Sequence, residues 1–574
     1  MSVVSAAART ERERPGQTGA LEPMSTRRQI AAAALIIMVG SVASRLLGLV
    51  REQVMAWLFG ATGATDAFVA ASAVPTMVYD LLVGGAISAA LVPVFVEVAQ
   101  DDARLWRLVS AILNLAGLAL LGVAALLALL ADPLIDVLGA GFAPEQHAAA
   151  VGMVRVMLAA VVLQGLAGVL MAVLYARQRF ALPAFAPAVY NGGIILLALL
   201  LHGRLGVAAL VAGVLAGAGG QLLLQLGGLR ALRYHLLLDL RLPEVRAILR
   251  LYAPVAAGML VTIAGITIDR YLASQLEAGS MTVMGYATRL IQFPLGLIAT
   301  ATAFAVLPTL AKHAGGMRPA PRPLNNGGSE TPPLLGGRGA ETTAGDADFH
   351  LQRYRETLAF GIKIILLLML PASLGLSILR EPLVRLLFEH RAFTGYDTLR
   401  TATVFLFYAP QLPFTALDQL LIFAFYARRD TVTPVVVGVL TVGCYVLVAL
   451  ATMGPLGVNG LALANAVQNS LHGLILLGLL WRAVGGLGTG ELLRFGGRVL
   501  LAAVAMALAL WLTLGPLSPL LAGSRLGLPG LLLAELVFGL VVYITAVIAL
   551  RVPEARQLVA AGLKPLASRL STGT

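Results

Sequence analysis

Fourteen runs of predominantly apolar residues, most of them close to 20 residues long, dominate the sequence. An α-helix rises about 1.5 Å per residue, so roughly 20 residues cross the hydrocarbon core of a bilayer. The composition agrees, because 59% of the 574 residues are hydrophobic and only 12% are charged. Water-soluble proteins carry about twice that charged fraction. The sequence therefore predicts an all-α polytopic membrane protein with about 14 transmembrane helices.

Basic residues set the predicted orientation of these runs, which we number as spans one to fourteen. The spans cover residues 30–58, 67–95, 108–131, 151–175, 185–201, 205–226, 251–272, 283–310, 358–379, 402–426, 435–453, 456–481, 499–514 and 531–550. Lys and Arg collect in cytoplasmic segments of membrane proteins. Of the 41 Lys and Arg residues, 29 lie in the two terminal segments and in alternate loops. Both termini are therefore predicted to be cytoplasmic, and the net charge of +12 reflects topology, with no nucleic acid as partner.

The two halves of the chain repeat one pattern. Tyr175-Ala176-Arg177 after span four returns as Tyr426-Ala427-Arg428 after span ten, 251 residues further on. Leu205-Gly206-Val207 at span six returns as Leu456-Gly457-Val458 at span twelve with the same offset. An even number of spans keeps both copies in one orientation. We therefore predict two six-helix bundles related by pseudo-twofold symmetry, plus two extra C-terminal helices.

The expected domain boundaries follow from these spans and from composition. Residues 315–348 are rich in Gly, Pro, Thr and Asn, which is typical of a disordered cytoplasmic linker. The first 29 residues are polar and lack the apolar core of a signal peptide. The expected divisions are 1–29 as a cytoplasmic N-terminal tail, 30–228 as the first bundle, 247–482 as the second bundle interrupted by the linker 315–348, 493–551 as the two extra helices and 552–574 as a cytoplasmic C-terminal tail.

Charged residues inside the spans indicate a functional cavity, because each costs at least a few kcal/mol at the bilayer centre. Span one carries Arg45, Arg51 and Glu52, and span eight carries Arg289. Guanidinium groups hold phosphate oxygens through paired hydrogen bonds and stay charged at every physiological pH. Arginines from both halves therefore predict an anionic substrate. For Arg51 the alternative is a side chain that reaches to the outer interface.

The absence of several short motifs argues against an ATP-hydrolysing pump and a classical hydrolase. The sequence has no GxxxxGK[ST] phosphate loop, no HExxH metal motif and no GxSxG nucleophile motif. Its single cysteine, Cys444, excludes an internal disulfide framework and a four-cysteine zinc site. We therefore expect a transporter and no enzyme, with no cofactor and no metal, driven by an ion gradient or by the membrane potential.

Several stretches resemble a known family. Residues 44–52 (SRLLGLVRE) and 64–68 (ATDAF) are similar to the opening of the MurJ (MviN) lipid II flippases, in the multidrug/oligosaccharidyl-lipid/polysaccharide exporter superfamily. The further matching stretches are Arg179-Phe180, Pro183 to Pro187, Asn191, Tyr286 to Leu290, Phe293-Pro294, Phe393-Thr394, Asp397-Thr398, Phe425 to Arg428 and Thr433-Pro434. The resemblance covers spans one to twelve in order, and fourteen spans are also typical of the family.

The resemblance implies a substrate and a place in the cell. A member of this family would move lipid II, the undecaprenyl-diphosphate-linked peptidoglycan precursor, from the inner to the outer leaflet by alternating access. It would act in peptidoglycan synthesis, and hence in cell-wall biogenesis and cell shape. Its place would be the bacterial cytoplasmic membrane, that is, the cell inner membrane or plasma membrane. Lipid II or a related polyprenyl-diphosphate glycolipid, membrane lipids and cell-wall synthesis proteins are the implied partners.

The resemblance also implies roles for individual residues. Arg45, Arg51 and Arg289 correspond to cavity arginines that hold the diphosphate and the acidic head group, and Glu52 stands where the family usually has Asp. Asp66 corresponds to a family acid at the external end of span two, and we expect both Asp66 and Glu52 to belong to the substrate-binding residues. The last two spans would help to form a groove for the lipid tail.

Ion coupling and the substrate itself leave alternatives open. Asp269 is our candidate for ion coupling. The chain has Tyr79, Asp80 and Gly84 where the family commonly has a basic pair and an acid, and Gln292 replaces another frequent acid. The open alternatives are a flippase for another lipid-linked oligosaccharide, a cation-coupled drug exporter, and a membrane scaffold that recruits cell-wall enzymes. Acids should dominate the cavity of a drug exporter, and a scaffold needs no buried arginines.

Overall fold

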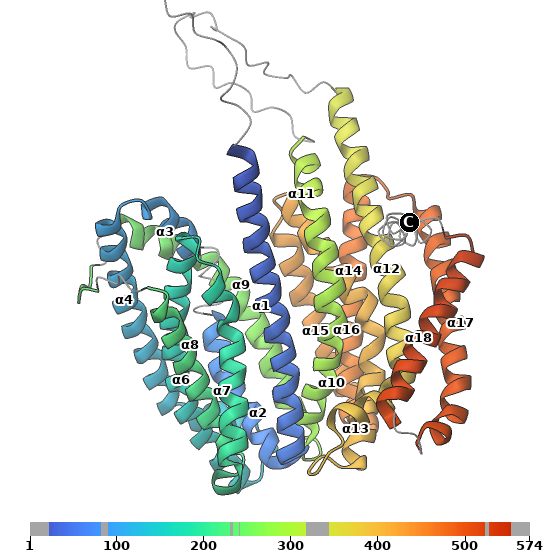
Figure 1. Cartoon of the computed structure of the whole chain (residues 1–574), viewed down its shortest axis with the longest axis horizontal. Helices are drawn as coiled ribbons and strands as arrows, with labels where there is room; N and C mark the ends of the chain where they lie inside the picture. Colours follow the sequence, from blue (N-terminus) through green and yellow to red (C-terminus); the bar gives the residue numbers. More distant parts are fainter. Residues whose placement is uncertain are drawn as a thin grey trace, which may run out of the picture.

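The computed structural model describes residues 22–81, 90–229, 234–239, 242–316, 344–522 and 527–552. These residues form eighteen α-helices and no β-strand (Figure 1). In chain order they are α1 (Glu22–Phe59), α2 (Gly63–Tyr79), α3 (Val92–Val98), α4 (Asp102–Leu129), α5 (Ala131–Leu138), α6 (Pro144–Ala176), α7 (Ala181–Leu205), α8 (Ala208–Gly227), α9 (Pro243–Ser274), α10 (Ser280–Pro294), α11 (Thr300–Gly316), α12 (Ala344–Phe388), α13 (Gly395–Tyr408), α14 (Leu412–Ala427), α15 (Val432–Leu456), α16 (Val458–Val484), α17 (Thr489–Ala522) and α18 (Gly527–Ala549).

The predicted all-α membrane fold is confirmed. Each of the fourteen spans overlaps a helix or a pair of consecutive helices. Within the described part of the chain, nine helices are individually long and apolar enough to cross a bilayer. Span eight is divided, because the π-helical turn η3 (Leu295–Ala299) separates α10 from α11. Span ten is divided as well, by the 3-10 turn η4 (Ala409–Gln411) between α13 and α14.

Two helices extend further toward the predicted cytoplasm than the spans do. α1 begins at Glu22, inside the expected tail, and α12 begins at Ala344, inside the expected linker. The start of α12 has Asp346 in its first turn, where a carboxylate interacts favourably with the helix dipole. An ion pair at i, i+3 joins Arg353 to Glu356 further along. Residues 1–21, 317–343 and 553–574, which make up most of the expected tails and linker, lie outside the described residues.

The backbone repeats as the sequence predicts. α7 and α15 have equal lengths and begin and end 251 positions apart. Both end at a glycine in the same conformation, Gly206 with φ 55° and ψ −137° and Gly457 with φ 57° and ψ −134°. Positive φ of this kind is readily adopted only by glycine. The preceding turns also match, because Gln178 and Arg429 both have positive φ.

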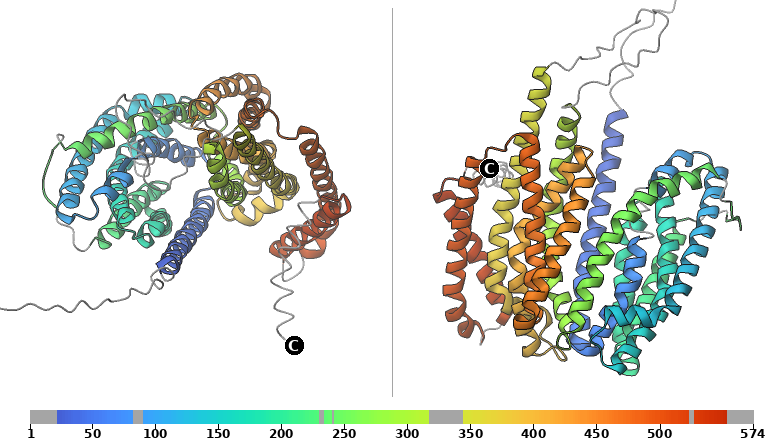
Figure 2. Two further views of the ribbon diagram at one scale, coloured as in Figure 1. Left: turned by 90° about the horizontal axis from the view of Figure 1, so that it is seen from above. Right: turned by 180° about the vertical axis from the view of Figure 1, so that it is seen from behind.

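The helices form two lobes and a C-terminal pair (Figures 1 and 2). In the first lobe α6 packs against α2, α4 and α8, while α7 packs against α8 and α1. In the second lobe α12, α14 and α16 pack with α10, α11, α13 and α15. α17 and α18 pack against each other and on α12, at the outer edge of the second lobe. This arrangement agrees with two bundles plus two extra helices.

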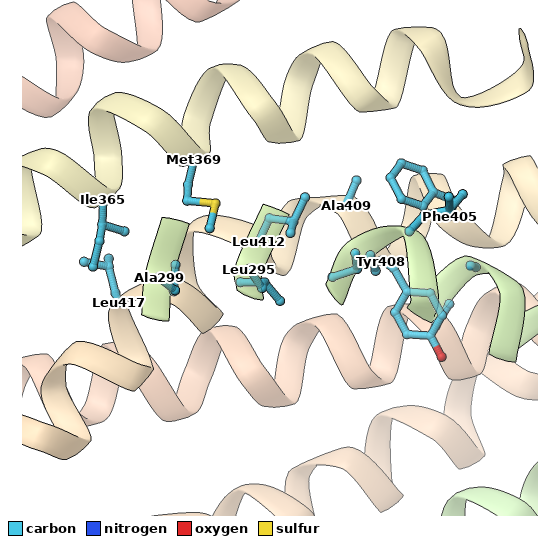
Figure 3. Close-up of a cluster of buried hydrophobic side chains, with 14 of the residues drawn as sticks. Leu295, Ala299, Ile365, Met369, Phe405, Tyr408, Ala409, Leu412 and Leu417 are labelled. Atoms are coloured by element: carbon cyan, nitrogen blue, oxygen red, sulfur yellow. The ribbon is translucent and has the colours of Figure 1, made fainter. Parts of the chain in front are cut away.

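The largest buried apolar cluster lies in the second lobe, where the divided spans meet. Figure 3 shows Leu295 and Ala299 of η3 close to Ile365 and Met369 of α12 and to the α13–α14 junction. All four of these side chains are buried. The interruption of the helix at η3 is therefore held in place by packing against α12 and α14.

The lobes are joined at their predicted external ends. The backbone N–H of Ala392 donates to the carbonyl of Trp57 at 3.3 Å, which links the α12–α13 loop to α1. The hydroxyl of Tyr286 on α10 donates to the carbonyl of Gly60 at 3.5 Å, and the N–H of Gly141 donates to Ser274 Oγ at 3.3 Å. In Figure 1 and in the right panel of Figure 2, the two lobes come together at this end and diverge toward the predicted cytoplasmic end.

Candidate functional site

A cavity of about 910 Å³ lies between the lobes, bounded by α1, α7, α10, α12, α17 and α18. One wall is polar and includes Arg45 and Arg51 from α1, Asn191 from α7 and Arg289 from α10. The opposite wall is formed mainly by leucines of α12, α17 and α18. The cavity therefore joins a basic region to an apolar groove.

A carboxylate lies between two of the arginines. Glu52 Oε1 accepts a hydrogen bond from Arg51 Nη2 at 2.6 Å and one from Arg289 Nε at 3.2 Å. Glu52 is 6% exposed, so its charge requires this pairing. Because α1 belongs to the first lobe and α10 to the second, the pair between Arg289 and Glu52 connects the two lobes. Arg51 is also fixed by α7, since its Nη1 donates to Asn191 Oδ1 at 3.1 Å.

Arg45 is the arginine available to a ligand. It is exposed to the cavity and makes no hydrogen bond or ion pair with the residues the structure describes. Its guanidinium lies against Gly296 in η3, across the gap between the lobes. A Cβ at Gly296 would overlap Arg45 Nη1, so glycine at this position leaves the space that the guanidinium occupies. Gly296 therefore forms a notch that receives Arg45.

Asp66 lies outside this cavity, at the predicted external end. Its Oδ2 accepts a hydrogen bond from the backbone N–H of Gly279 at 2.7 Å, and its Oδ1 accepts from the N–H and hydroxyl of Thr282 at 2.9 and 2.6 Å. Asp66 is 3% exposed. A residue at the start of α2 in the first lobe therefore caps the start of α10 in the second. The structure does not bring it together with the arginines.

Asp269 also lies apart from the arginines. It is on α9 and accepts a hydrogen bond from the hydroxyl of Tyr445 on α15 at 2.7 Å. The described residues contain no group of three or more His, Cys, Asp or Glu side chains that could hold a metal ion.

The positions that depart from the family pattern fall in different places. Gln292 lines the cavity and accepts a hydrogen bond from Arg289 Nη1 at 3.2 Å. Tyr79 and Asp80 lie at the end of α2 and not on the cavity wall. Gly84 lies outside the described residues.

The structure adds three residues to the site that the sequence analysis did not single out for it: Asn191 and Glu535 line the cavity, and Gly296 lies against the guanidinium of Arg45. Asn191 belongs to a family-like stretch, so its position could have suggested a role. Nothing in the sequence pointed to a role for Gly296, because glycine is common in apolar runs. Glu535 is the one Asp, Glu, Lys or Arg in span fourteen, and a charged residue in a span is itself a functional signal.

Comparisons with known proteins identify the family. The family model described as lipid II flippase MurJ matches residues 55–319 and 342–525. A probable lipid II flippase MurJ of Bdellovibrio bacteriovorus is 29% identical over 499 residues, covering 84% of this chain and 88% of that protein. The lipid II flippase MurJ of Burkholderia cenocepacia is 30% identical over 465 residues, covering 77% and 82%.

Solved structures show the same fold. A lipid II flippase MurJ in an inward closed conformation aligns with a TM-score of 0.70 at 21% identity, over 89% of this chain and 98% of that one. An inward-facing MATE family transporter of the MOP superfamily aligns with a TM-score of 0.62 at 13% identity, over 79% and 99%. The chain is therefore a multi-pass membrane protein that belongs to the lipid II flippase MurJ family.

Proposed function

We propose that this protein is a lipid II flippase of the bacterial cytoplasmic membrane. It moves the undecaprenyl-diphosphate-linked precursor of peptidoglycan from the inner to the outer leaflet, with both termini in the cytoplasm. The observation that carries the proposal is one cavity that combines arginines from both lobes with an adjoining apolar groove. The names of the relatives support lipid II as the substrate.

The two regions of the cavity suit the two parts of such a lipid. Arg45, Arg51 and Arg289 supply donors for the diphosphate oxygens, with Arg45 free to make the first contact. The leucine-lined wall of α12, α17 and α18 suits a polyprenyl chain, because burying the apolar surface of such a chain away from water is favourable. An acid-dominated cavity, as expected of a drug exporter, is less consistent with these three arginines.

Alternating access is the mechanism that fits this arrangement. The halves 30–228 and 247–482 would rock about the cavity, with an ion gradient or the membrane potential as the energy source and Asp269 as a candidate coupling group. In this mechanism the contacts at the predicted external end would belong to the inward-facing state. Binding of a diphosphate between Arg51 and Arg289 would compete with Glu52 for both guanidinium groups, and so link substrate binding to the position of the lobes.

Complementation tests the proposed function. Expression of the protein in a bacterium depleted of its own lipid II flippase should restore growth, normal cell shape and the arrival of labelled lipid II in the outer leaflet. A strain lacking a flippase for another lipid-linked oligosaccharide serves as the comparison and should not be rescued. Folded, membrane-inserted protein that rescues the second strain and not the first would contradict the proposal.

Gly296→Ala tests the placement of Arg45. The added methyl group should displace the guanidinium and leave the helices in place, because the clash involves the mobile end of a long side chain. We expect the affinity of the purified protein for undecaprenyl diphosphate to fall about tenfold, which is the effect of losing about one charge-assisted hydrogen bond. Gly285→Ala is the matched control, because a Cβ at Gly285 in α10 meets no atom within 4 Å.

A double-variant comparison separates positioning from general damage. Gly296→Ala should cause no additional loss of affinity in a protein that already carries Arg45→Ala. If the two losses add, the notch does not act through Arg45.

A further inference from the structure

Glu535 on α18 is a completely buried carboxyl group at the apolar end of the cavity. Its exposed fraction is 0%, and it borders the cavity together with Leu510, Leu536 and Leu540. Neither the arginine cluster nor the two-lobe repeat includes it. A carboxyl group at this depth is costly if charged, so its presence needs a physical reason.

The contacts of Glu535 are incomplete. Its Oε2 lies 2.9 Å from the hydroxyl oxygen of Thr513 on α17, while its Oε1 has no hydrogen-bond partner among the described residues. The same hydroxyl lies 3.0 Å from the carbonyl oxygen of Ala509 and 3.3 Å from that of Leu510. No salt bridge to Glu535 occurs in the described part of the chain. An ionised carboxylate would therefore have one hydrogen bond and no counter-charge, which is strongly unfavourable in an apolar setting.

The hydroxyl group of Thr513 can hydrogen-bond to Glu535 in either of its charge states, and its oxygen atom need not move. When Glu535 is protonated, its O–H donates to the Thr513 oxygen and the threonine hydroxyl donates to Ala509. When Glu535 is ionised, the hydroxyl turns and donates to the carboxylate. The side chains therefore form a site that binds or releases a proton with only the rotation of one hydroxyl.

A metal cation does not suit this site. Na⁺ or a divalent ion needs about six oxygen ligands, and the described groups within reach are one carboxyl, one hydroxyl and backbone carbonyls already bonded in α17. A proton needs only one carboxyl oxygen, Oε2, and the hydroxyl oxygen of Thr513 beside it.

Other titratable groups border the same cavity. Tyr543 on α18 is occupied, since its hydroxyl donates to the carbonyl of Leu367 at 2.6 Å. The cavity-lining residues of α12 and α17 include no titratable side chain. The opposite wall contributes Tyr190 from α7 and the three cavity arginines, and none of them is hydrogen-bonded to Glu535. No described charge faces Glu535, and its carboxyl group is shielded from the groove in this structure, so ionisation requires the packing around it to open to water.

We propose that Glu535 is a proton-binding site, and that an apolar lipid chain enters the adjoining groove together with a proton on this carboxyl group. This rests on the proposed function, which supplies a polyprenyl chain as the occupant. A chain packed in the groove would hold the site closed to the water that an ionised carboxylate needs. By linkage, chain binding favours the protonated form, and protonation favours chain binding. Affinity should therefore fall as the pH rises.

The test measures binding of undecaprenyl diphosphate to the purified full-length protein in nanodiscs, from about pH 5.5 to about pH 8.5. Glu535→Gln keeps the shape of a neutral carboxyl group and cannot ionise. The wild-type protein should bind as tightly as this variant at acidic pH and about tenfold more weakly at alkaline pH. The ratio of the two affinities removes the titration of the diphosphate itself, because both proteins meet the same ligand.

Proton uptake gives a second readout. In weak buffer with an indicator dye at alkaline pH, the wild-type protein should take up about one more proton per bound ligand than Glu535→Gln does. Glu491→Gln is the matched control, because Glu491 is an exposed acid paired with Lys363 near the predicted cytoplasmic surface. It should behave as the wild type.

Thr513→Val tests the same site without changing the acid. The loss of the hydroxyl removes the donor to the carboxylate, so the fall in affinity should move to more alkaline pH. Equal pH dependence and equal proton uptake in wild type and Glu535→Gln would overturn the proposal. Since both proteins would still bind the lipid in that case, the proposed flippase function would remain intact.

Discussion

Replacement of Arg289 by alanine should abolish the arrival of labelled lipid II in the outer leaflet of flippase-depleted cells. A guanidinium makes two charge-assisted hydrogen bonds with a phosphate group, each contributing about 1.5–3 kcal/mol. Their loss corresponds to about a 100-fold or larger decrease in affinity. Arg289 is also the cavity arginine that belongs to the second lobe, so its removal leaves Glu52 paired only with Arg51 of its own helix. The variant should lose both substrate contacts and the connection between the lobes.

The control for Arg289→Ala is Arg155→Ala. Arg155 is a half-exposed arginine in α6, paired with Asp132 away from the cavity. Such exposed pairs contribute only about 0–1 kcal/mol, so Arg155→Ala should support normal growth. Both variants must reach the membrane in equal amounts, as judged by immunoblotting. Normal flipping by Arg289→Ala would eliminate the proposed role of the arginine cluster, whatever the behaviour of the other variants.

The sequence predicted the fold well because the insertion of a helix into a bilayer depends mainly on the length and hydrophobicity of the segment. The length of an apolar run determines whether a helix crosses the bilayer, and alternation of basic loops determines its direction. The repeated motifs then located the two lobes, since Gly206 and Gly457 end equivalent helices. Interruptions such as η3 were not predictable in this way, because the residues of a π-helical turn are as apolar as those of the helices beside it.

The candidate site was predictable in part. Arg45, Arg51, Glu52 and Arg289 stood out because charges in spans are costly and therefore rare. The pairing of Glu52 with Arg289 was not predictable, because it depends on the packing of two lobes that are distant in sequence. Asp66 was associated with the substrate by family position, and its hydrogen bonds to α10 depend on the same packing.

Asp66→Ala should open the cavity toward the outside. The aspartate supplies three hydrogen bonds to the start of α10, and the alanine variant leaves the N–H groups of Gly279 and Thr282 without their acceptor. Loss of a charged cap of this kind costs about 1–3 kcal/mol. Because the cap links the two lobes, the cost falls on the state in which their external ends touch. We expect that state to lose about tenfold or more in relative population.

Accessibility of a cavity cysteine measures this change. Ser44→Cys places a thiol on the cavity wall, in a background where the native Cys444 is replaced by serine. A membrane-impermeant thiol reagent added outside intact cells should label it faster in Asp66→Ala than in the parent. Asp397→Ala is the matched control, because Asp397 caps α13 through Thr394 within the second lobe alone. It should increase labelling less than Asp66→Ala does, because its own hydrogen bonds stay within the second lobe. Equal labelling of all three proteins would mean that the contact between Asp66 and α10 does not hold the external end closed.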